Sequence, residues 1–250
     1  MEIADWRDTL SASCHFWVGP GGRYFAEPGL ALTFSGELAL DLNVAICHAP
    51  GTAAVGRALA GVVDTGSPGL VMLAGPALGA ARVLSDAGWI PVSAMPFMVR
   101  SISPSDPDER VRRLGMAGLD ELRLLFEKAF GMPSRVAQLA LPNVAASDAP
   151  DADPDVAVWG LYEGDEMVSG VATVKVGDSI CVWSMSTHPA RQQRGYGRRL
   201  LVGVLAHAAN EGARRCLLLA TPSGDALYRS MGFTVMEHWQ IWSRRRWVLV

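Results

Sequence analysis

Residues 188–201 of the chain read HPARQQRGYGRRLL. The apolar stretch 180–185, which is typical of a strand, precedes them, and a stretch with helical character follows. The pattern Gln192-x-x-Gly195-x-Gly197 therefore lies at a turn from a strand into a helix. The first N–H groups of a helix have no partner inside it and carry partial positive charge, so they can bind a phosphate group. Neither glycine has a Cβ atom that would keep a ligand away from the backbone.

The same segment is rich in positive charge, which comes from Arg191, Arg194, Arg198 and Arg199. A guanidinium group can bind a phosphate through two parallel hydrogen bonds. The loop alone does not decide between a phosphate site and an ordinary helix start with solvated arginines, because glycine-rich turns are common.

The segments after the loop add a second pattern. Residues 214–220 are typical of a short buried strand, and the sequence TPSG at 221–224 indicates a turn or a helix start. The sequence DALYRSMGF at 225–233 predicts a short helix that ends at Gly232, since glycine is favoured just after a helix C-terminus. A last strand is expected over 233–242.

This order of loop, helix, strand and a helix ending in Tyr-x-x-x-Gly-Phe resembles that of the GNAT superfamily of N-acetyltransferases. The resemblance implies an α/β fold, with helices around a mixed sheet, and acetyl-CoA as cosubstrate without a metal. It also implies transfer of the acetyl group directly to a primary amine of a small molecule or a peptide.

The resemblance also assigns roles to individual residues. Backbone amides of Met185, Ser186 and Thr187 would pair with the pantetheine arm of CoA and polarise the thioester carbonyl. Tyr228 matches the family tyrosine that protonates the leaving CoA thiolate. The residues expected to bind the cofactor in the loop, through the pyrophosphate, are Gln192, Gln193, Arg194, Gly195, Tyr196, Gly197 and Arg198.

The general base is not identified by the sequence. An attacking amine must lose a proton, because its reference pKa is ~10 by analogy with lysine. The strand 180–186 has no carboxylate, although many GNAT relatives carry a glutamate near there. The candidates are a chain of water molecules and the side chains of Ser184, Ser186, His188, Glu237 and His238.

The first half of the chain resembles the second. A strand expected over 38–47 ends in His48-Ala49-Pro50, as the strand before the loop ends in His188-Pro189. Three later segments also match, namely 56–59 with 197–200, 70–74 with 216–220, and 84–89 with 228–233. We therefore predict two tandem copies, over 1–100 and 101–250, with a junction rich in turn formers at 101–108. The alternative is that residues 1–95 form an unrelated α/β cap.

The first copy is expected to be degenerate. Its segment 50–59 lacks the glycine pattern and is two residues shorter than 189–200. Leu84 stands where Tyr228 stands in the second copy, and leucine cannot donate a proton. We therefore expect the first half to have lost CoA binding and catalysis, and to shape the acceptor site of the second half.

Composition limits the partners. The net charge of −3 gives no reason to expect nucleic acid or an anionic membrane surface as a partner. No uncharged apolar run approaches ~18 residues, and the acidic N-terminus does not resemble a secretory signal, so we expect a cytoplasmic protein. The cysteines lack the spacing of a metal site and are expected to be reduced. A tryptophan-rich last strand, if exposed, would suit contact in a homodimer.

Two other functions stay open. One is a tandem GNAT-like protein that binds or senses acyl-CoA without turnover, which the missing carboxylate and the degenerate half favour. The intact Tyr228 argues against it, since a sensor has no need of a leaving-group acid. The other is an acyltransferase that uses a longer acyl-CoA.

Overall fold

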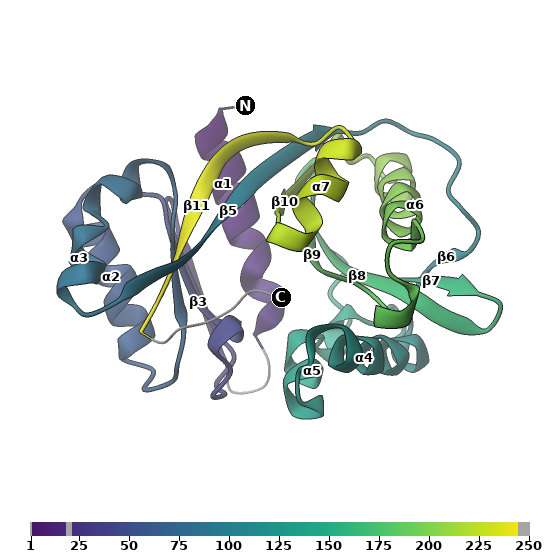
Figure 1. Ribbon diagram of the computed structural model, residues 1–250, viewed down its shortest axis with the longest axis horizontal. Coiled ribbons are helices and arrows are strands. Elements are labelled where there is room, and N and C mark those ends of the chain that lie inside the picture. The colour runs from purple at the N-terminus through teal and green to yellow at the C-terminus, as the bar shows by residue number, and fades with distance from the viewer. Residues whose placement is uncertain (1, 19–21, 245–250) are drawn as a thin grey trace. The chain divides into compact units, whose positions relative to one another are not determined.

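A computed structural model describes residues 2–18 and 22–244 of the chain (Figure 1). Its contacts divide the chain into two compact units. The split unit comprises Met1–Met98 and Leu219–Val250, and the continuous unit comprises Val99–Leu218. No helix among the described residues is both long enough and apolar enough to cross a membrane.

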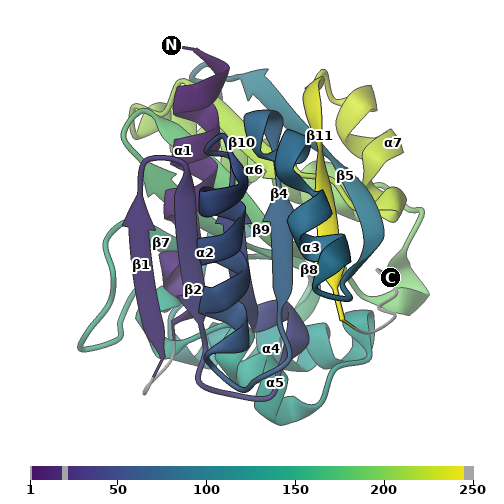
Figure 2. The same cartoon turned by 90° about the vertical axis from the view of Figure 1, so that its left-hand side faces the viewer.

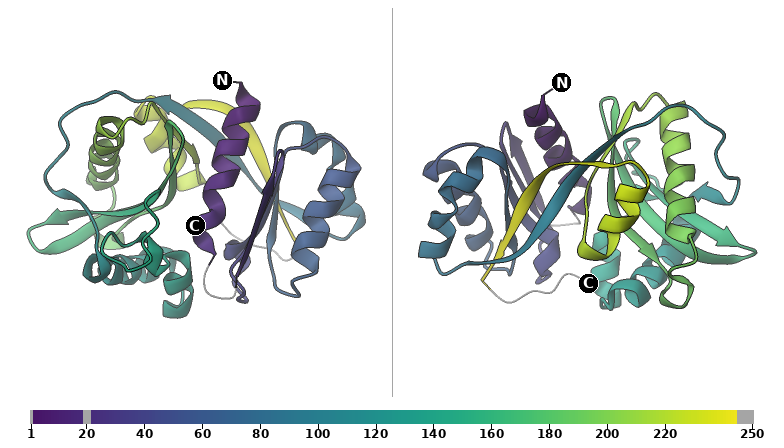
Figure 3. Two further views of the ribbon diagram at one scale, coloured as in Figure 1. Left: turned by 180° about the vertical axis from the view of Figure 1, so that it is seen from behind. Right: turned by 45° about the horizontal axis from the view of Figure 1, so that its top comes forward.

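The continuous unit contains a mixed sheet in the order β6-β7-β8-β9-β10. The pairs from β6 to β9 are antiparallel, whereas β9 and β10 are parallel. Figures 1 and 3 show α4 and α6 on opposite sides of these strands. Its elements are β6 (Val111–Arg113), α4 (Met116–Phe130), α5 (Ser134–Ala140), η4 (Asn143–Ala145), β7 (Val156–Glu163), β8 (Glu166–Val176), β9 (Ser179–Thr187), η5 (Pro189–Arg191), α6 (Tyr196–Asn210) and β10 (Arg215–Leu219), whose last residue belongs to the split unit.

The core of this unit follows from the spacing of apolar residues. Helix α4 buries Leu119, Leu122, Leu125 and Phe126, which recur every three or four residues and so share one face. Strands β7, β8 and β9 are buried over most of their length, as expected for strands covered on both faces. These layers hold the end of β9 and the start of α6 in place.

The split unit has strands in the order β1-β2-β3-β4-β11, followed by β5. In Figure 2, α2 and α3 lie in front of its strands. Strand β5 begins in this unit and ends in the continuous one. Its elements are α1 (Ile3–Ala12), η1 (Ser13–Trp17), β1 (Arg23–Glu27), β2 (Leu30–Phe34), η2 (Leu40–Leu42), β3 (Asn43–Cys47), α2 (Thr52–Val63), β4 (Leu70–Leu73), η3 (Gly75–Ala80), α3 (Arg82–Asp86), β5 (Ile90–Ser101), α7 (Pro222–Ser230) and β11 (Thr234–Ser243).

Two expectations about this unit were wrong. The strand expected from residue 38 begins only at Asn43, because the Asn43 amide donates to the carbonyls of Glu37 and Ala39 and holds the preceding residues in a turn. The last strand is not an exposed aromatic surface, because Trp239 and Trp242 are 0% and 5% exposed. The argument for a homodimer through these tryptophans therefore fails.

The two sequence halves contain the same run of elements. Three strands paired in antiparallel fashion lead into a helix and a parallel strand, as β1-β2-β3-α2-β4 and as β7-β8-β9-α6-β10. The short helices that follow end alike: Trp89 donates its N–H to the carbonyl of Leu84 at 2.9 Å, and Phe233 to that of Tyr228 at 3.1 Å. The likeness agrees with an internal repeat, and the repeat with its boundary near residue 100 stays a prediction.

Candidate functional site

Strand β9 contains an irregularity just before the loop. Gly170 of β8 lies opposite Ser186, but Ala172 lies opposite Trp183, so that Ser184 and Met185 together face Val171. This is a β-bulge, which bends a strand and increases its twist. Ser184 has a φ of 52°, in the left-handed region that non-glycine residues rarely adopt. The bulge therefore redirects the three residues that lead to the loop.

The ladder between β9 and β10 ends before the bulge. Its last pair joins Cys181 to Leu217, and β9 runs on to Thr187. The edge of β9 that faces β10 is thus available to another extended group from the bulge onward. An extended amide-containing ligand can pair with such an edge as an added strand does. The predicted residues Met185, Ser186 and Thr187 lie together on this stretch.

Hydroxyl groups fix the far side of the same stretch. Ser169 of β8 donates its hydroxyl to the carbonyl of Ser186 at 2.6 Å and lies 2.9 Å from the hydroxyl of Thr187. The buried Ser186 hydroxyl donates to the carbonyl of Gly170 at 3.4 Å. These bonds hold the end of β9 against β8 and leave its other edge facing β10.

The loop after β9 forms a concave backbone. Gln193 and Gly195 have φ values of 60° and 83°, both in the left-handed region. Alternation of left- and right-handed residues turns successive N–H groups to one side and makes an anion-binding concavity. The side-chain amide of Gln192 donates to the carbonyl of Thr187 at 3.4 Å and so ties the loop to the end of β9.

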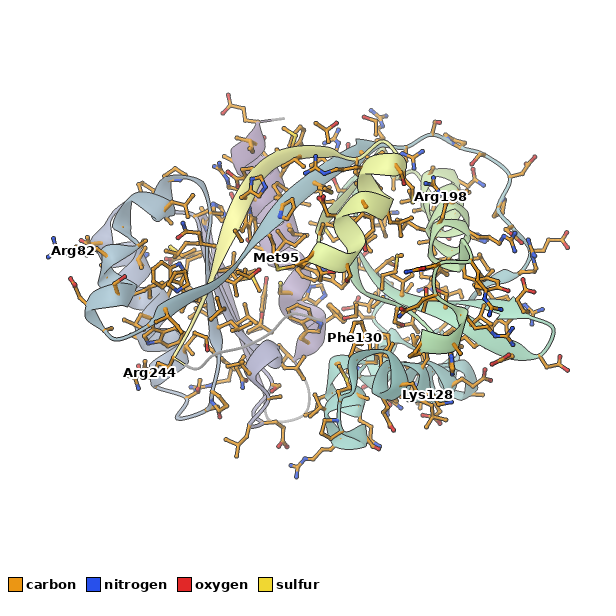
Figure 4. The ribbon with its side chains drawn as sticks, viewed as in Figure 1. Arg82, Met95, Lys128, Phe130, Arg198 and Arg244 are labelled. Carbon is orange, nitrogen blue, oxygen red and sulfur yellow. The ribbon has the colours of Figure 1, made fainter. Side chains whose placement is uncertain are left out.

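Helix α6 begins at this concavity. The first bond inside the helix runs from the N–H of Arg199 to the carbonyl of Gly195, so the N–H groups of Tyr196, Gly197 and Arg198 lie at its open end. A Cβ atom at Gly195 would meet no protein atom within 4 Å, which leaves room for a ligand. The side chain of Arg198, on the same helix, appears in Figure 4. The structure thus brings together all the predicted residues from Met185 to Arg198.

Two of the loop arginines are paired with carboxylates. Arg191 lies 2.6 Å from Glu166, and this hydrogen bond raises the pKa of the Arg191 guanidinium. Arg199 lies 3.4 Å from Glu163 and 3.9 Å from Asp108. Sequence reasoning missed these acidic partners, because Glu163 and Glu166 lie more than twenty residues before the arginines that they contact.

Two of the candidate bases, His188 and Glu237, are already engaged in the structure. The Nδ1 atom of His188 accepts a hydrogen bond from the N–H of Ala190 at 3.2 Å, which uses the basic lone pair of the neutral ring. Glu237 binds Arg7 through both carboxylate oxygens, at 2.8 and 2.6 Å, and accepts a bond from the Trp239 indole at 2.8 Å. No general base is assigned.

Tyr228 lies on α7, in the split unit. Its ring is buried and packs edge-on against Phe233, with the ring centres 5.7 Å apart. A Cβ atom at Gly224, one turn earlier, would lie 2.7 Å from the Tyr228 ring, so glycine gives the ring its space. The catalytic role of Tyr228 stays a prediction.

Metal ligands do not gather in the described part of the chain. No group of three or more histidine, cysteine, aspartate or glutamate side chains there could hold a metal ion. All four cysteines are buried thiols that form no disulfide bond.

One segment of the chain matches a known family model. Residues 154–235 match the family model described as the acetyltransferase (GNAT) domain, a segment that includes the bulge, the loop and Tyr228. No protein among the curated ones matches the chain in sequence.

Solved structures resemble the chain over most of its length. A GCN5-related N-acetyltransferase from Kribbella flavida is 17% identical with a TM-score of 0.67, over 97% of this chain and 96% of that one. A GCN5-related N-acetyltransferase from Sphaerobacter thermophilus is 17% identical with a TM-score of 0.58, over 93% and 81%. A putative GNAT acetyltransferase from Novosphingobium aromaticivorans is 18% identical with a TM-score of 0.55, over 93% and 97%. At these identities the likeness shows the fold.

Proposed function

We propose that this chain is a GNAT acetyltransferase, which transfers an acetyl group from acetyl-CoA directly to a primary amine of a small molecule or peptide. The observation that carries the proposal is that two features, a strand edge and an anion-binding loop, follow each other on one stretch of backbone. The stretch of β9 that runs past its last pair with β10, from the bulge to Thr187, leads directly into the anion-binding concavity at the start of α6.

The two features fit the two chemical parts of CoA. The amides of the pantetheine arm can pair with the β9 edge at Met185 to Thr187. The pyrophosphate suits the concave loop, where left-handed backbone and the helix start direct N–H groups to one side. The thioester of acetyl-CoA supplies an activated acyl group when it is bound.

The residues of the chain then have separate tasks. Backbone N–H groups at the bulge can donate to the thioester carbonyl and stabilise the oxyanion that forms during attack. Tyr228 donates a proton to the departing thiolate, which makes it a better leaving group. The group that takes the proton of the amine is left unassigned, because His188 and Glu237 are engaged elsewhere and a chain of water molecules is an equal candidate.

The engaged state of His188 and Glu237 also favours a second function. Without a base, the protein could bind acyl-CoA as a sensor and release it unchanged. The finer choices, namely the acceptor amine and the acyl chain length, depend on side chains around the acceptor.

Calorimetric titration with acetyl-CoA, followed by an assay of thiol release with a panel of amines, tests the proposal. One site per chain with a Kd in the micromolar range, near −8 kcal/mol, together with amine-dependent thiol release, supports acetyl transfer. Binding without release for any amine supports the sensor. A chain-length series of acyl-CoAs identifies a longer donor, and no binding contradicts both functions.

A further inference from the structure

The hairpin between β7 and β8 carries a cluster of carboxylates beside the anion-binding loop. Its turn contains Glu163, Asp165 and Glu166, and Glu166 makes the 2.6 Å ion pair with Arg191 of the loop. Glu163 faces Arg199 at 3.4 Å and Arg110 at 3.6 Å. Negative charge thus surrounds a site that is suited to a polyanion.

These ion pairs are not needed to hold the fold. The side chains of Arg191 and Glu166 are 35% and 50% exposed. Pairs with such exposure contribute about 0–1 kcal/mol to stability, because water screens the charges and the side chains lose freedom. The hairpin itself is secured by the long β7–β8 ladder. Another role for the pairs is therefore worth considering.

We propose that Glu166 is a built-in competitor for the cosubstrate, which occupies Arg191 until a phosphate of acyl-CoA displaces it. This inference rests on the proposed function. The planar guanidinium binds a carboxylate and a phosphate with the same two-pronged geometry, so one group can replace the other. A carboxylate beside the loop also repels the phosphates of CoA. Both effects weaken CoA binding.

The consequence concerns release as much as binding. Acetyl-CoA and free CoA carry the same phosphates, so Glu166 weakens both equally and does not act on the reacting carbonyl. Such uniform weakening raises KM and limits inhibition by the CoA product, while the chemical step is unchanged. Glu166 is thus an affinity-setting residue and takes no part in catalysis.

The test compares Glu166→Gln with Asp165→Asn, which removes the same charge from the neighbouring position of the hairpin. At low salt, Glu166→Gln is expected to tighten CoA binding about two- to fivefold, and Asp165→Asn by less than about twofold. The gain should shrink at 0.5 M salt, where screening is strong. Arg191→Gln should weaken binding and abolish the effect of Glu166→Gln in the double variant.

Several outcomes would overturn the inference. Weaker CoA binding by Glu166→Gln would mean that the carboxylate holds Arg191 in place for the ligand. An equal gain in CoA affinity from Asp165→Asn would mean that Glu166 acts only through the overall negative charge of the hairpin, not through its ion pair with Arg191.

Inorganic pyrophosphate serves as a second probe that separates this inference from the proposed function. A wild type that binds pyrophosphate but not CoA contradicts the proposed function alone, and the variants still test the competition. A wild type that binds neither contradicts both.

Discussion

The connection from β9 to α6 and the connection from β3 to α2 occupy equivalent positions in the two halves but differ in backbone conformation. Each follows a strand that has a parallel neighbour, and each enters its helix through a glycine with positive φ, namely Gly195 with φ 83° and ψ 2° and Gly51 with φ 92° and ψ 159°. The histidines that open the two turns also match, because His188 donates its N–H to the carbonyl of Val168 and His48 donates to that of Gly29.

The strands before the two turns differ. Strand β3 pairs with β4 through its final residue, Cys47, and the N–H of Ala74 extends the contact to the Cys47 carbonyl at 3.0 Å. Its pairing with β2 keeps one register throughout. Strand β9 instead has the bulge at Ser184 and continues beyond its last pair with β10.

Helix α1 contributes charged side chains at the ends of β3 and β4. The guanidinium of Arg7 lies directly over the backbone of Gly75, just after β4, and is bound by Glu237. Asp8 accepts from the N–H of Gly29 and lies 3.2 Å from Nε2 of His48, just after β3. The comparison teaches that equivalent turns can follow strands that end differently, because β3 pairs with β4 to its last residue whereas β9 runs on past its last pair with β10. This difference supports the prediction that the first half has lost CoA binding.

The largest effect is expected at Tyr228, which is compared with Leu84 at the equivalent position of the first half. Tyr228→Phe should lower kcat by ~10²–10⁴, because the leaving thiolate loses its acid, while the Kd for acetyl-CoA stays nearly constant. Leu84→Met is the matched control and should leave both values unchanged. Steady-state kinetics with calorimetry measure this pair, and an unaltered kcat in Tyr228→Phe would contradict the assigned acid.

The next comparison concerns two ion pairs of equal length and unequal burial. Arg7–Glu237 and Arg191–Glu166 are both 2.6 Å long, but the side chains of the first pair are 11% and 15% exposed. Arg7→Met should lower the free energy of unfolding by about 3 kcal/mol, because it leaves a largely buried carboxylate unpaired. Arg191→Met should cost less than about 1 kcal/mol. Denaturant unfolding of the variants decides, and equal losses would contradict the structural role of the Arg7 pair.

A third pair separates backbone strain from ligand binding. Gly195→Ala should cost about 1 kcal/mol in stability, because it forces a side chain into the left-handed region. Gly51→Ala should cost more, about 1–3 kcal/mol, because its φ of 92° and ψ of 159° are nearly restricted to glycine. Only Gly195→Ala should also weaken acetyl-CoA binding, because its Cβ atom projects into the concave loop. Thermal melts and calorimetry on the same samples test this. A loss of affinity in Gly51→Ala would show that the first turn also takes part in binding.

The smallest effect is a dependence of stability on pH. Burial lowers the pKa of His48 below its usual 6.5, and Arg7 lowers it further, against the opposing charges of Asp8 and Glu237. The folded state thus keeps His48 neutral, while the unfolded state takes up a proton below pH 6.5. Stability should fall as the pH drops through this range, by at most about 1.4 kcal/mol per pH unit. His48→Gln should flatten the slope of unfolding free energy between pH 5 and 7, and an unchanged slope would exclude His48 as its source.

Local patterns predicted much of the second half of the chain. Glycines at a strand-to-helix turn and the apolar spacing of α4 and α6 each depend on neighbouring residues, so the sequence places them well. The bulge at Ser184 could not be predicted, because it depends on the register with β8 and no special residue marks it. The Arg7–Glu237 pair joins the two ends of the sequence, and no local pattern signals such a contact.

Strand β11 belongs to the split unit, and this has a consequence for the order of folding during synthesis. The continuous unit is one uninterrupted segment, so it can fold as soon as it leaves the ribosome. The split unit cannot finish then, because Met72 of β4 pairs with Ile241 of β11, which is made last. Until that strand arrives, β4 presents an apolar open edge in the nascent chain, of the kind that invites aggregation or chaperone binding. The split unit is thus completed after the continuous unit, although its first strands are made earlier.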